Sequence, residues 1–306
     1  MAFATTRLPD ARRWCIALSG GPDSLALTAA AAGVLPTTAL IVDHGLQPGS
    51  DRVAATAREQ ALALGCTDAR VLTVRVGSDG GPEAAARTAR FAALATSREE
   101  APVLLGHTLD DQAETVLLGL GRGSGARSIA GMRDCDPPWY RPLLEIRRGV
   151  THAVCAELGM SAWDDPHNHD RRFTRVRLRL DVLPLLEDAL GGGVAEALAR
   201  TAVSLREDTD LLDALAADRL NGARVGSGLE IDAVRDLPPA LRRRVLRAWL
   251  LTGGAVGLTD LQIRAVDALI ADWHGQGGVA VSGAVPRTRL FAERVAGTLT
   301  LRSEPV

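Results

Sequence analysis

The chain has 306 residues, 46% of them hydrophobic and 24% charged, with a formal net charge of -2. This length and apolar content are sufficient for two domains with buried cores, and the near-neutral charge does not itself announce a nucleic-acid partner. All 35 basic residues are arginine, which excludes a Walker-type phosphate loop because that loop requires a lysine.

The chain contains no apolar stretch of the kind found in signal peptides or membrane helices. We therefore expect a cytoplasmic protein without a membrane partner. The four cysteines are scattered without a CxxC pair, so neither a disulfide framework nor a zinc or redox site is indicated. The sequence leaves the oligomeric state open.

Four apolar runs in the first half alternate with alanine-rich segments typical of helices. Buried strands separated by helices predict an α/β fold with a doubly wound, mainly parallel sheet. The strands are expected at 14–19, 38–43, 71–76 and 103–108.

Each predicted strand ends in polar residues, in the order SGGPDS, DHGL, GSDGG and GHTLDDQAET. Ligands of such sheets bind at the carboxyl ends of the strands. The four polar segments therefore predict a binding site at this edge.

The second half changes to long leucine- and alanine-rich helical patterns after the glycines at 191–193. We predict a catalytic domain over 1–190 and a smaller, mostly helical domain over 191–306. The last residues alternate and break at glycines, which predicts a terminal hairpin or three-strand patch.

The SGGPDS segment joins a predicted strand to a predicted helix. Gly20 and Gly21 let backbone amides approach a phosphate, and Ser19 and Ser24 add hydroxyl groups. Asp23 would repel a phosphate unless a cation such as Mg²⁺ lay between them. The alternative is that Asp23 caps the following helix.

These segments carry a resemblance to a known family. SGGPDS is similar to the loop of the N-type ATP pyrophosphatases, also called PP-loop enzymes, which implies an adenine nucleotide alpha hydrolase-like fold. Four further segments, in family order, resemble the tRNA(Ile)-lysidine synthases within that superfamily. They are DHGLQPGS (43–50), PEAAARTARF (82–91), the block from Gly106 to Met132, and RPLLEIRR followed by WDDPHNHDRRFTRVRLRLDVLPLL (141–148 and 163–186).

The resemblance implies a ligase that uses ATP to adenylate C2 of the wobble cytidine, position 34, of tRNA(Ile) with a CAU anticodon. L-lysine then displaces AMP to give lysidine. The expected ligands and partners are ATP, Mg²⁺, L-lysine and this tRNA, and the expected helical domain would bind tRNA.

The resemblance also implies roles for individual residues. Asp23, Arg87, His107, Asp110 and Asp111 are expected to be catalytic, and Asp23 to hold the metal. Thr108 and Val176 depart from the family pattern, which usually has histidine and asparagine at these positions. The remaining assignments are ATP binding by Ser19, Gly20, Gly21, Pro22, Asp23, Ser24, Asp43 and His44; lysine or substrate binding by Asp111, Glu114, Arg122, Gly123 and Ser124; and tRNA binding by Arg171, Arg172, Arg175 and Arg179.

Several alternatives stay open. Asp43 could be a turn residue, Asp110 or Asp111 could cap a helix, and Arg87 could belong to a solvated helix face. The arginines at 241–247 form either a second tRNA-binding surface or a charged helix face. The rival functions are a cytidine thiolase of the same superfamily, against which the lack of a CxxC pair speaks, and a non-catalytic nucleotide-binding module.

Overall fold

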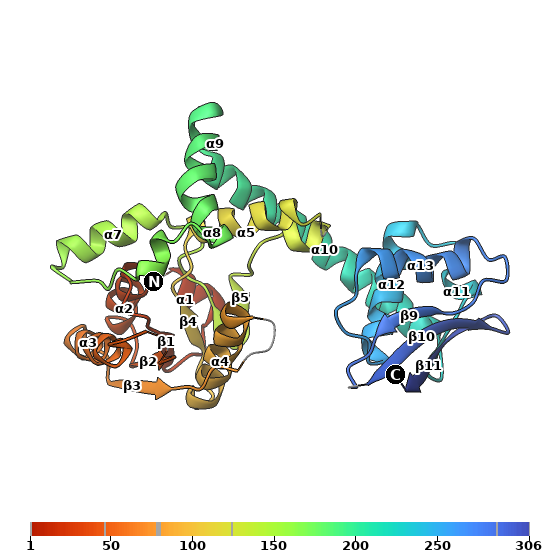
Figure 1. Ribbon diagram of the computed structural model, residues 1–306, viewed down its shortest axis with the longest axis horizontal. Coiled ribbons are helices and arrows are strands. Elements are labelled where there is room, and N and C mark those ends of the chain that lie inside the picture. The colour runs from red at the N-terminus through yellow and green to blue at the C-terminus, as the bar shows by residue number, and fades with distance from the viewer. Residues whose placement is uncertain (1, 46, 78–80, 124, 286, 306) are drawn as a thin grey trace. The chain divides into compact units, whose positions relative to one another are not determined.

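The computed structural model describes residues 2–45, 47–77, 81–123, 125–285 and 287–305 (Figure 1). Two compact units make up the chain. The first comprises Met1–Leu118 and Gly131–Arg200, and the second comprises Gly119–Ala130 and Thr201–Val306. The short segment Gly119–Ala130 thus belongs with the carboxyl-terminal residues. Within the described residues, no helix has the length and apolar character needed to cross a membrane.

The first unit is built on a six-stranded sheet with the order β3-β2-β1-β4-β6-β5. All neighbouring pairs are parallel except β5 and β6. The predicted doubly wound, mainly parallel fold is therefore confirmed. Its strands are β1 (Trp14–Ala17), β2 (Thr37–Asp43), β3 (Asp68–Thr73), β4 (Val103–Leu105), β5 (Cys135–Asp136) and β6 (Trp139–Tyr140).

Helices cover both faces of this sheet because its central strands are apolar on both sides. Ala39 and Ile41 pack with residues of α2 and α3, whereas Leu40, which points the other way, packs with Leu94 of α4. The helices of this unit are α1 (Ala2–Arg7), α2 (Pro22–Ala32), α3 (Ser50–Ala63), α4 (Pro82–Ser97), α5 (Leu109–Gly121), α7 (Arg148–Glu157), α8 (Thr174–Arg177) and α9 (Leu183–Ala189), with a 3-10 turn at Pro166–His169 and a π-helical turn at Leu178–Val182.

Strand β3 lies three residues earlier than the predicted run at 71–76. It is the outermost parallel strand, and Asp68 and Arg70 form an ion pair on it. An edge strand is only partly buried, so its first half can be polar and the apolar run does not mark its beginning.

The second unit packs helices against a five-stranded antiparallel sheet of order β7-β8-β11-β10-β9. The last three strands form the patch predicted near the end of the sequence, and β7 and β8 extend it. Helix α10 carries the chain from the first unit into the second. The elements are α6 (Ala126–Ile129), α10 (Val194–Ala223), β7 (Arg224–Val225), β8 (Gly228–Glu230), α11 (Asp232–Arg235), α12 (Pro239–Thr252), α13 (Asp260–Ala271), β9 (Val279–Ser282), β10 (Thr288–Val295) and β11 (Thr298–Pro305).

Candidate active site

The turn between β1 and α2 carries the SGGPDS sequence. Gly20 has a φ of +82°, a left-handed conformation that favours glycine. The Ser24 hydroxyl donates to the Gly21 carbonyl over 2.9 Å and accepts from the Ser19 amide over 3.2 Å. No side chain caps α2. The turn therefore places the backbone of two glycines at the positive end of a helix, which is the chemistry of a phosphate site.

Two distant segments lie against this turn. A side chain at Gly106 would come within 3.1 Å of the Ser24 backbone, so a glycine there lets the segment after β4 approach this closely without a shift of the turn. The Trp163 amide donates to the Gly20 carbonyl over 2.8 Å. The three segments that contain Gly20, Gly106 and Trp163 each resemble the family, and they contact one another in the structure.

Asp23 does not cap α2, so the alternative role considered for it is wrong. Its carboxylate instead accepts a hydrogen bond from the Thr151 hydroxyl of α7 and a longer one, 3.4 Å, from the Arg148 Nε. Asp23 is thereby directed toward the acidic residues at the start of α5.

Thr108 and Asp111 together close the first turn of α5. The Thr108 amide and hydroxyl donate to Asp111 Oδ2 over 2.8 and 2.9 Å. The Asp111 amide lies 3.4 Å from the Thr108 hydroxyl. This is the reciprocal pattern of a capping box, with aspartate in the usual place of glutamate. The threonine at this departure from the family pattern thus supplies the hydrogen bonds that begin the helix.

Arg148, the first residue of α7, joins the acidic residues. Its Nη2 donates to Asp111 Oδ1 over 2.6 Å, and its Nη1 lies 3.4 Å from Glu114 Oε1. Its backbone amide donates to Asp110 Oδ2 over 2.7 Å. With its contact to Asp23, one guanidinium of 16% exposure connects the phosphate-type turn to the acidic block.

Glu114 lies at the centre of the block, with a fully buried side chain. Arg179 donates to it over 2.8 Å from the π-helical turn, and Arg175 lies 3.7 Å away. Arg175 also donates to the Thr115 hydroxyl. Of the arginines predicted to bind tRNA, these two therefore turn toward the acidic residues.

The charges of the block stabilise one another. Burial alone would raise the pKa of Asp111, but Arg148 and the Thr108 amide hold that pKa below its ordinary value. Burial would likewise lower the pKa of Arg148, yet Asp111, Glu114 and Asp23 raise it. The carboxylate of Asp111 and the guanidinium of Arg148 therefore both stay ionised at neutral pH.

Two imidazoles follow the strands on either side of β1. Within the described residues, the Nδ1 atoms of His44 and His107 are buried without a hydrogen-bond partner. Burial lowers the pKa of both rings, that of His107 to about 3, and the charge of Arg90 on α4 adds to this effect. Both rings are therefore neutral at pH 7. Among the described residues, the Arg90 guanidinium makes no hydrogen bond or ion pair.

The other predicted residues belong to other elements than Arg148. Asp43 accepts a hydrogen bond from the Gly45 amide, as a turn residue would. Arg87 is exposed and lies over the Phe91 ring, with 4.8 Å to the ring centre. The exposed Arg171 and Arg172 pair with Asp181 and Asp170. Arg122 and Gly123 are exposed residues of the second unit, and Ser124 is outside the described residues.

The carboxylates at the carboxyl ends of the strands are the type of ligand that Mg²⁺ prefers. Within the part of the chain that the structure describes, no three histidine, cysteine or acidic side chains are grouped to hold a metal ion. Magnesium ions in phosphate sites commonly take one or two carboxylates together with substrate oxygens. Asp23, at the turn, fits that smaller ligand set.

Arg148 and Thr151 are contacts that the sequence did not predict. The segment RPLLEIRR resembles the family pattern, but this resemblance implies no role for its last arginine. A cation at the first position of a helix is unusual, because the helix dipole disfavours positive charge there, and this anomaly was the available signal. The acidic partners that explain it lie 34 to 125 residues away in sequence.

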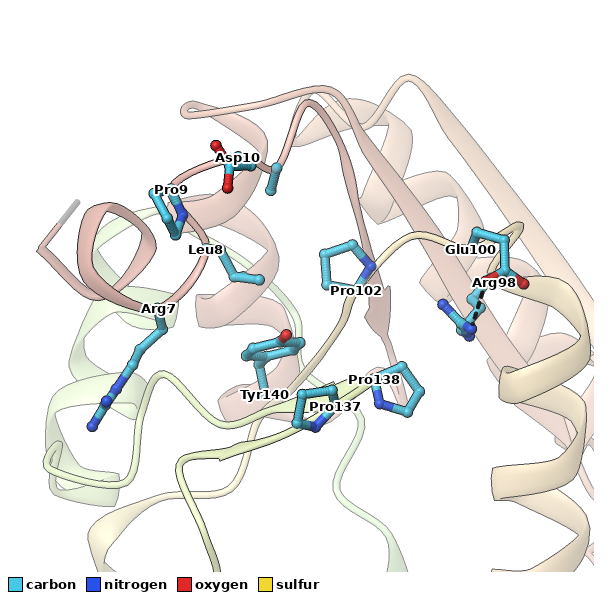
Figure 2. Close-up of a pocket in the computed structure, with 11 residues that line it drawn as sticks. Arg7, Leu8, Pro9, Asp10, Arg98, Glu100, Pro102, Pro137, Pro138 and Tyr140 are labelled. Carbon is cyan, nitrogen blue, oxygen red and sulfur yellow. Dashed lines mark hydrogen bonds and ion pairs between the residues drawn. The ribbon is translucent and has the colours of Figure 1, made fainter.

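A depression of about 480 Å³ lies elsewhere, at the amino ends of β1, β4 and β6 (Figure 2). Pro102, Pro138 and Tyr140 line it together with Leu8 and the ion-paired Arg98 and Glu100. Its place at the opposite edge of the sheet separates it from the turn after β1.

Comparisons with known proteins agree with this geometry. The PP-loop domain family matches residues 2–186, and the TilS substrate binding domain matches residues 229–299. A solved U34-tRNA thiolase from Methanococcus maripaludis has the same fold over 64% of this chain and 72% of its own, with a TM-score of 0.52 and 17% identity.

Curated relatives are much more similar. A tRNA(Ile)-lysidine synthase from Mycolicibacterium paratuberculosis is 68% identical over 100% of this chain and 95% of its own length. Those of Mycobacterium tuberculosis and Rhodococcus jostii are 68% and 58% identical over 99% and 94% of this chain, and over 95% and 88% of their own. Identity of this extent, together with both family matches, shows that the chain belongs to the PP-loop enzymes and, among them, to the tRNA(Ile)-lysidine synthase family.

Proposed function

We propose that the chain ligates L-lysine to C2 of cytidine 34 in tRNA(Ile) with a CAU anticodon. ATP is consumed, and AMP and pyrophosphate are released. The observation that supports this most directly is the connection, through Arg148, of the phosphate-type turn to the acidic block in a member of this family.

The reaction has two steps. The O2 atom of the cytidine attacks the α-phosphorus of ATP, and the bond from that phosphorus to the bridging oxygen breaks to release pyrophosphate. The lysine amine then attacks C2, AMP leaves with the former O2 atom, and the nitrogen loses a proton. The protein must therefore hold a triphosphate, a base and an amine in one place.

The turn after β1 provides for the triphosphate. Gly20, Gly21 and Ser19 directly precede α2, and negative charge is stabilised at the start of a helix. Asp23 would hold Mg²⁺, which supplies positive charge for the phosphate oxygens. The cations of α4 suit the departing pyrophosphate. Arg87 is the predicted residue, and the Arg90 guanidinium, which has no ion pair among the described residues and whose charge acts on both neutral imidazoles, is a second donor of the same kind.

The acidic block provides for the amine. A lysine ammonium is bound by carboxylate oxygens, which Asp111 and Glu114 provide. The Arg148 guanidinium that contacts these two residues also contacts Asp23. The 3.4 Å contact of Arg148 to Asp23 is long, so this oxygen can accept a further donor, whereas Glu114 Oε1 already accepts from Arg179 over 2.8 Å. Both proposed substrates would then bind within reach of the same arginine.

The test is incubation with ATP, Mg²⁺, labelled lysine and unmodified tRNA(Ile) bearing CAU. We expect incorporation of lysine into the tRNA, at least about 100-fold slower in Asp23→Asn because phosphate and metal binding both depend on this carboxylate. The control is Asp188→Asn, an exposed carboxylate of α9, which should behave like the wild type. Failure of the wild type to incorporate lysine while it binds ATP would refute the proposal, and incorporation of sulfur instead would identify a thiolase.

A further inference from the structure

Carboxylates and arginines of the first unit balance one another near the turn after β1. Each of the four carboxylates has an arginine nitrogen within 3.4 Å. The carboxylates are those of Asp23, Asp110, Asp111 and Glu114, and the guanidinium groups that contact them are those of Arg147, Arg148, Arg175 and Arg179. A lysine ammonium would be a fifth cation among four carboxylates, so it must compete with an arginine for carboxylate oxygens.

The pairing of Asp111 Oδ1 depends mainly on Arg148. Among the described residues, this oxygen accepts its hydrogen bond from Arg148 Nη2 over 2.6 Å, while Arg179 Nη2 lies 3.5 Å away. The other oxygen, Oδ2, accepts from the Thr108 amide and hydroxyl. Glu114 has its shortest contact, 2.8 Å, with Arg179. Movement of Arg148 would therefore make Asp111 Oδ1 available to another cation, whereas Asp111 Oδ2 and Glu114 would stay paired.

Arg148 also contacts the phosphate-type turn. Its Nε lies 3.4 Å from Asp23 Oδ2, which is a long contact, whereas the Thr151 hydroxyl donates to Asp23 Oδ1. Asp23 therefore keeps a hydrogen-bond partner if the guanidinium turns. Phosphate oxygens bound at this turn would offer the planar guanidinium bidentate, charge-assisted hydrogen bonds, which are stronger than its long contacts to Asp23 and Glu114.

We propose that Arg148 is an exchangeable cation that couples the binding of ATP to the binding of lysine, an inference that rests on the proposed function. When the triphosphate binds at the turn, the guanidinium moves from Asp111 to the phosphate oxygens. Asp111 Oδ1 then accepts a hydrogen bond from the lysine amine. Because ATP removes a competitor of lysine, each substrate raises the affinity of the protein for the other.

The experiment measures the binding of labelled L-lysine to the full chain by equilibrium dialysis. It is performed with Mg²⁺, in the presence and absence of an ATP analogue that has a methylene group between its α- and β-phosphorus atoms. This analogue cannot release pyrophosphate, so binding is measured without chemistry. For the wild type we expect the analogue to tighten lysine binding about tenfold, and lysine to tighten binding of the analogue by the same factor.

In Arg148→Met both factors should fall below about twofold, because the exchangeable cation is gone. Without the analogue, this variant should bind lysine at least as tightly as the wild type does, since no guanidinium competes for Asp111. The control is Arg264→Met, which removes the same charge from an exposed i,i+4 pair on α13 and should keep the coupling of the wild type.

The outcomes separate this inference from the proposed function. A purely structural role for Arg148 would weaken lysine binding in Arg148→Met under both conditions, and that result would overturn the inference. Equal lysine affinities of the wild type with and without the analogue would also overturn it, whether or not the variant folds. Coupled binding without incorporation of lysine into tRNA would overturn only the proposed function. Wild-type protein that binds no lysine under either condition would overturn both.

Discussion

Arg148 shows how one side chain can organise a site and also stabilise the fold. It is 16% exposed and contacts three carboxylates through its guanidinium. Removing a buried partner leaves opposite charges uncompensated, which costs far more than removing an exposed one.

We expect Arg148→Met to lower the free energy of unfolding by about 3 to 5 kcal/mol, because Asp111 and Glu114 would remain buried without this cation. Arg264→Met is the control, since that side chain is 54% exposed and pairs with the exposed Asp260, and it should cost less than about 1 kcal/mol. Urea denaturation measures both. Equal losses in the two variants would show that Arg148 is no more important to stability than a surface arginine.

His107 makes stability depend on pH. Burial, opposed by Asp111, lowers the pKa of His107 from 6.5 to about 3. Between these values the unfolded chain binds the proton and the folded chain does not, so stability falls as the pH falls. The stability that depends on the neutral His107 ring is fully present above pH 6.5.

For His107→Gln we therefore expect a shallower loss of stability on acidification, by up to about 1.4 kcal/mol per pH unit between pH 6 and pH 4. The free energies of unfolding of variant and wild type, measured at four pH values in this interval, give the slopes. Parallel profiles would mean that the imidazole is protonated equally in both states.

At the scale of elements, α5 illustrates what a sequence pattern can and cannot indicate. The acidic start of the helix was visible in the sequence, and its polar residues were correctly placed after a strand. The reciprocal bonds of Thr108 and Asp111 could also be derived, since both are local. By contrast, nothing local indicated that the end of α5 belongs with the second unit.

Alanine substitutions at two glycines near the end of α5 are expected to change the stability in opposite directions. A methyl group on Gly119 would lie 2.3 Å from the Ser128 carbonyl oxygen of α6, whereas one on Gly121 would have no neighbour within 4 Å. We expect Gly119→Ala to destabilise the second unit by about 1 to 3 kcal/mol through overpacking. Gly121→Ala should stabilise it by up to about 1 kcal/mol, because alanine restricts the unfolded chain.

Thermal unfolding of the two variants, with hydrogen exchange to locate the change, measures this difference. If Gly119→Ala were as stable as Gly121→Ala, α6 would have to be able to move away from α5. The glycines at 119–125 would then need an explanation other than packing.

At the scale of the molecule, the sequence predicted the first unit better than the second. Strands β1, β2 and β4 are buried on both faces, so their apolar runs indicate them directly. The two-residue strand β7 and three-residue strand β8 are too short for any period to be detected. The site was predicted where it depends on local loops, and Arg148 was missed because its partners come from other parts of the chain.

Each unit has its own core, which makes their stabilities separable. Leu246 and Trp249 are fully buried in a cluster drawn from residues 216–299 and lined by further residues of the second unit alone. The clusters around Leu18, Leu40 and the other first-unit strands contain no residue of that set. Loss of one core should therefore leave the other intact.

We expect Leu246→Ala to destabilise the second unit by about 2 to 5 kcal/mol, because a buried leucine leaves a cavity. Leu261→Ala is the control in the same unit, since that side chain is 78% exposed, and it should change stability by less than about 0.5 kcal/mol. Hydrogen exchange should show lost protection within 201–305 and 119–123, with ATP affinity unchanged. A parallel loss of ATP affinity would show instead that the fold of the first unit depends on the core of the second.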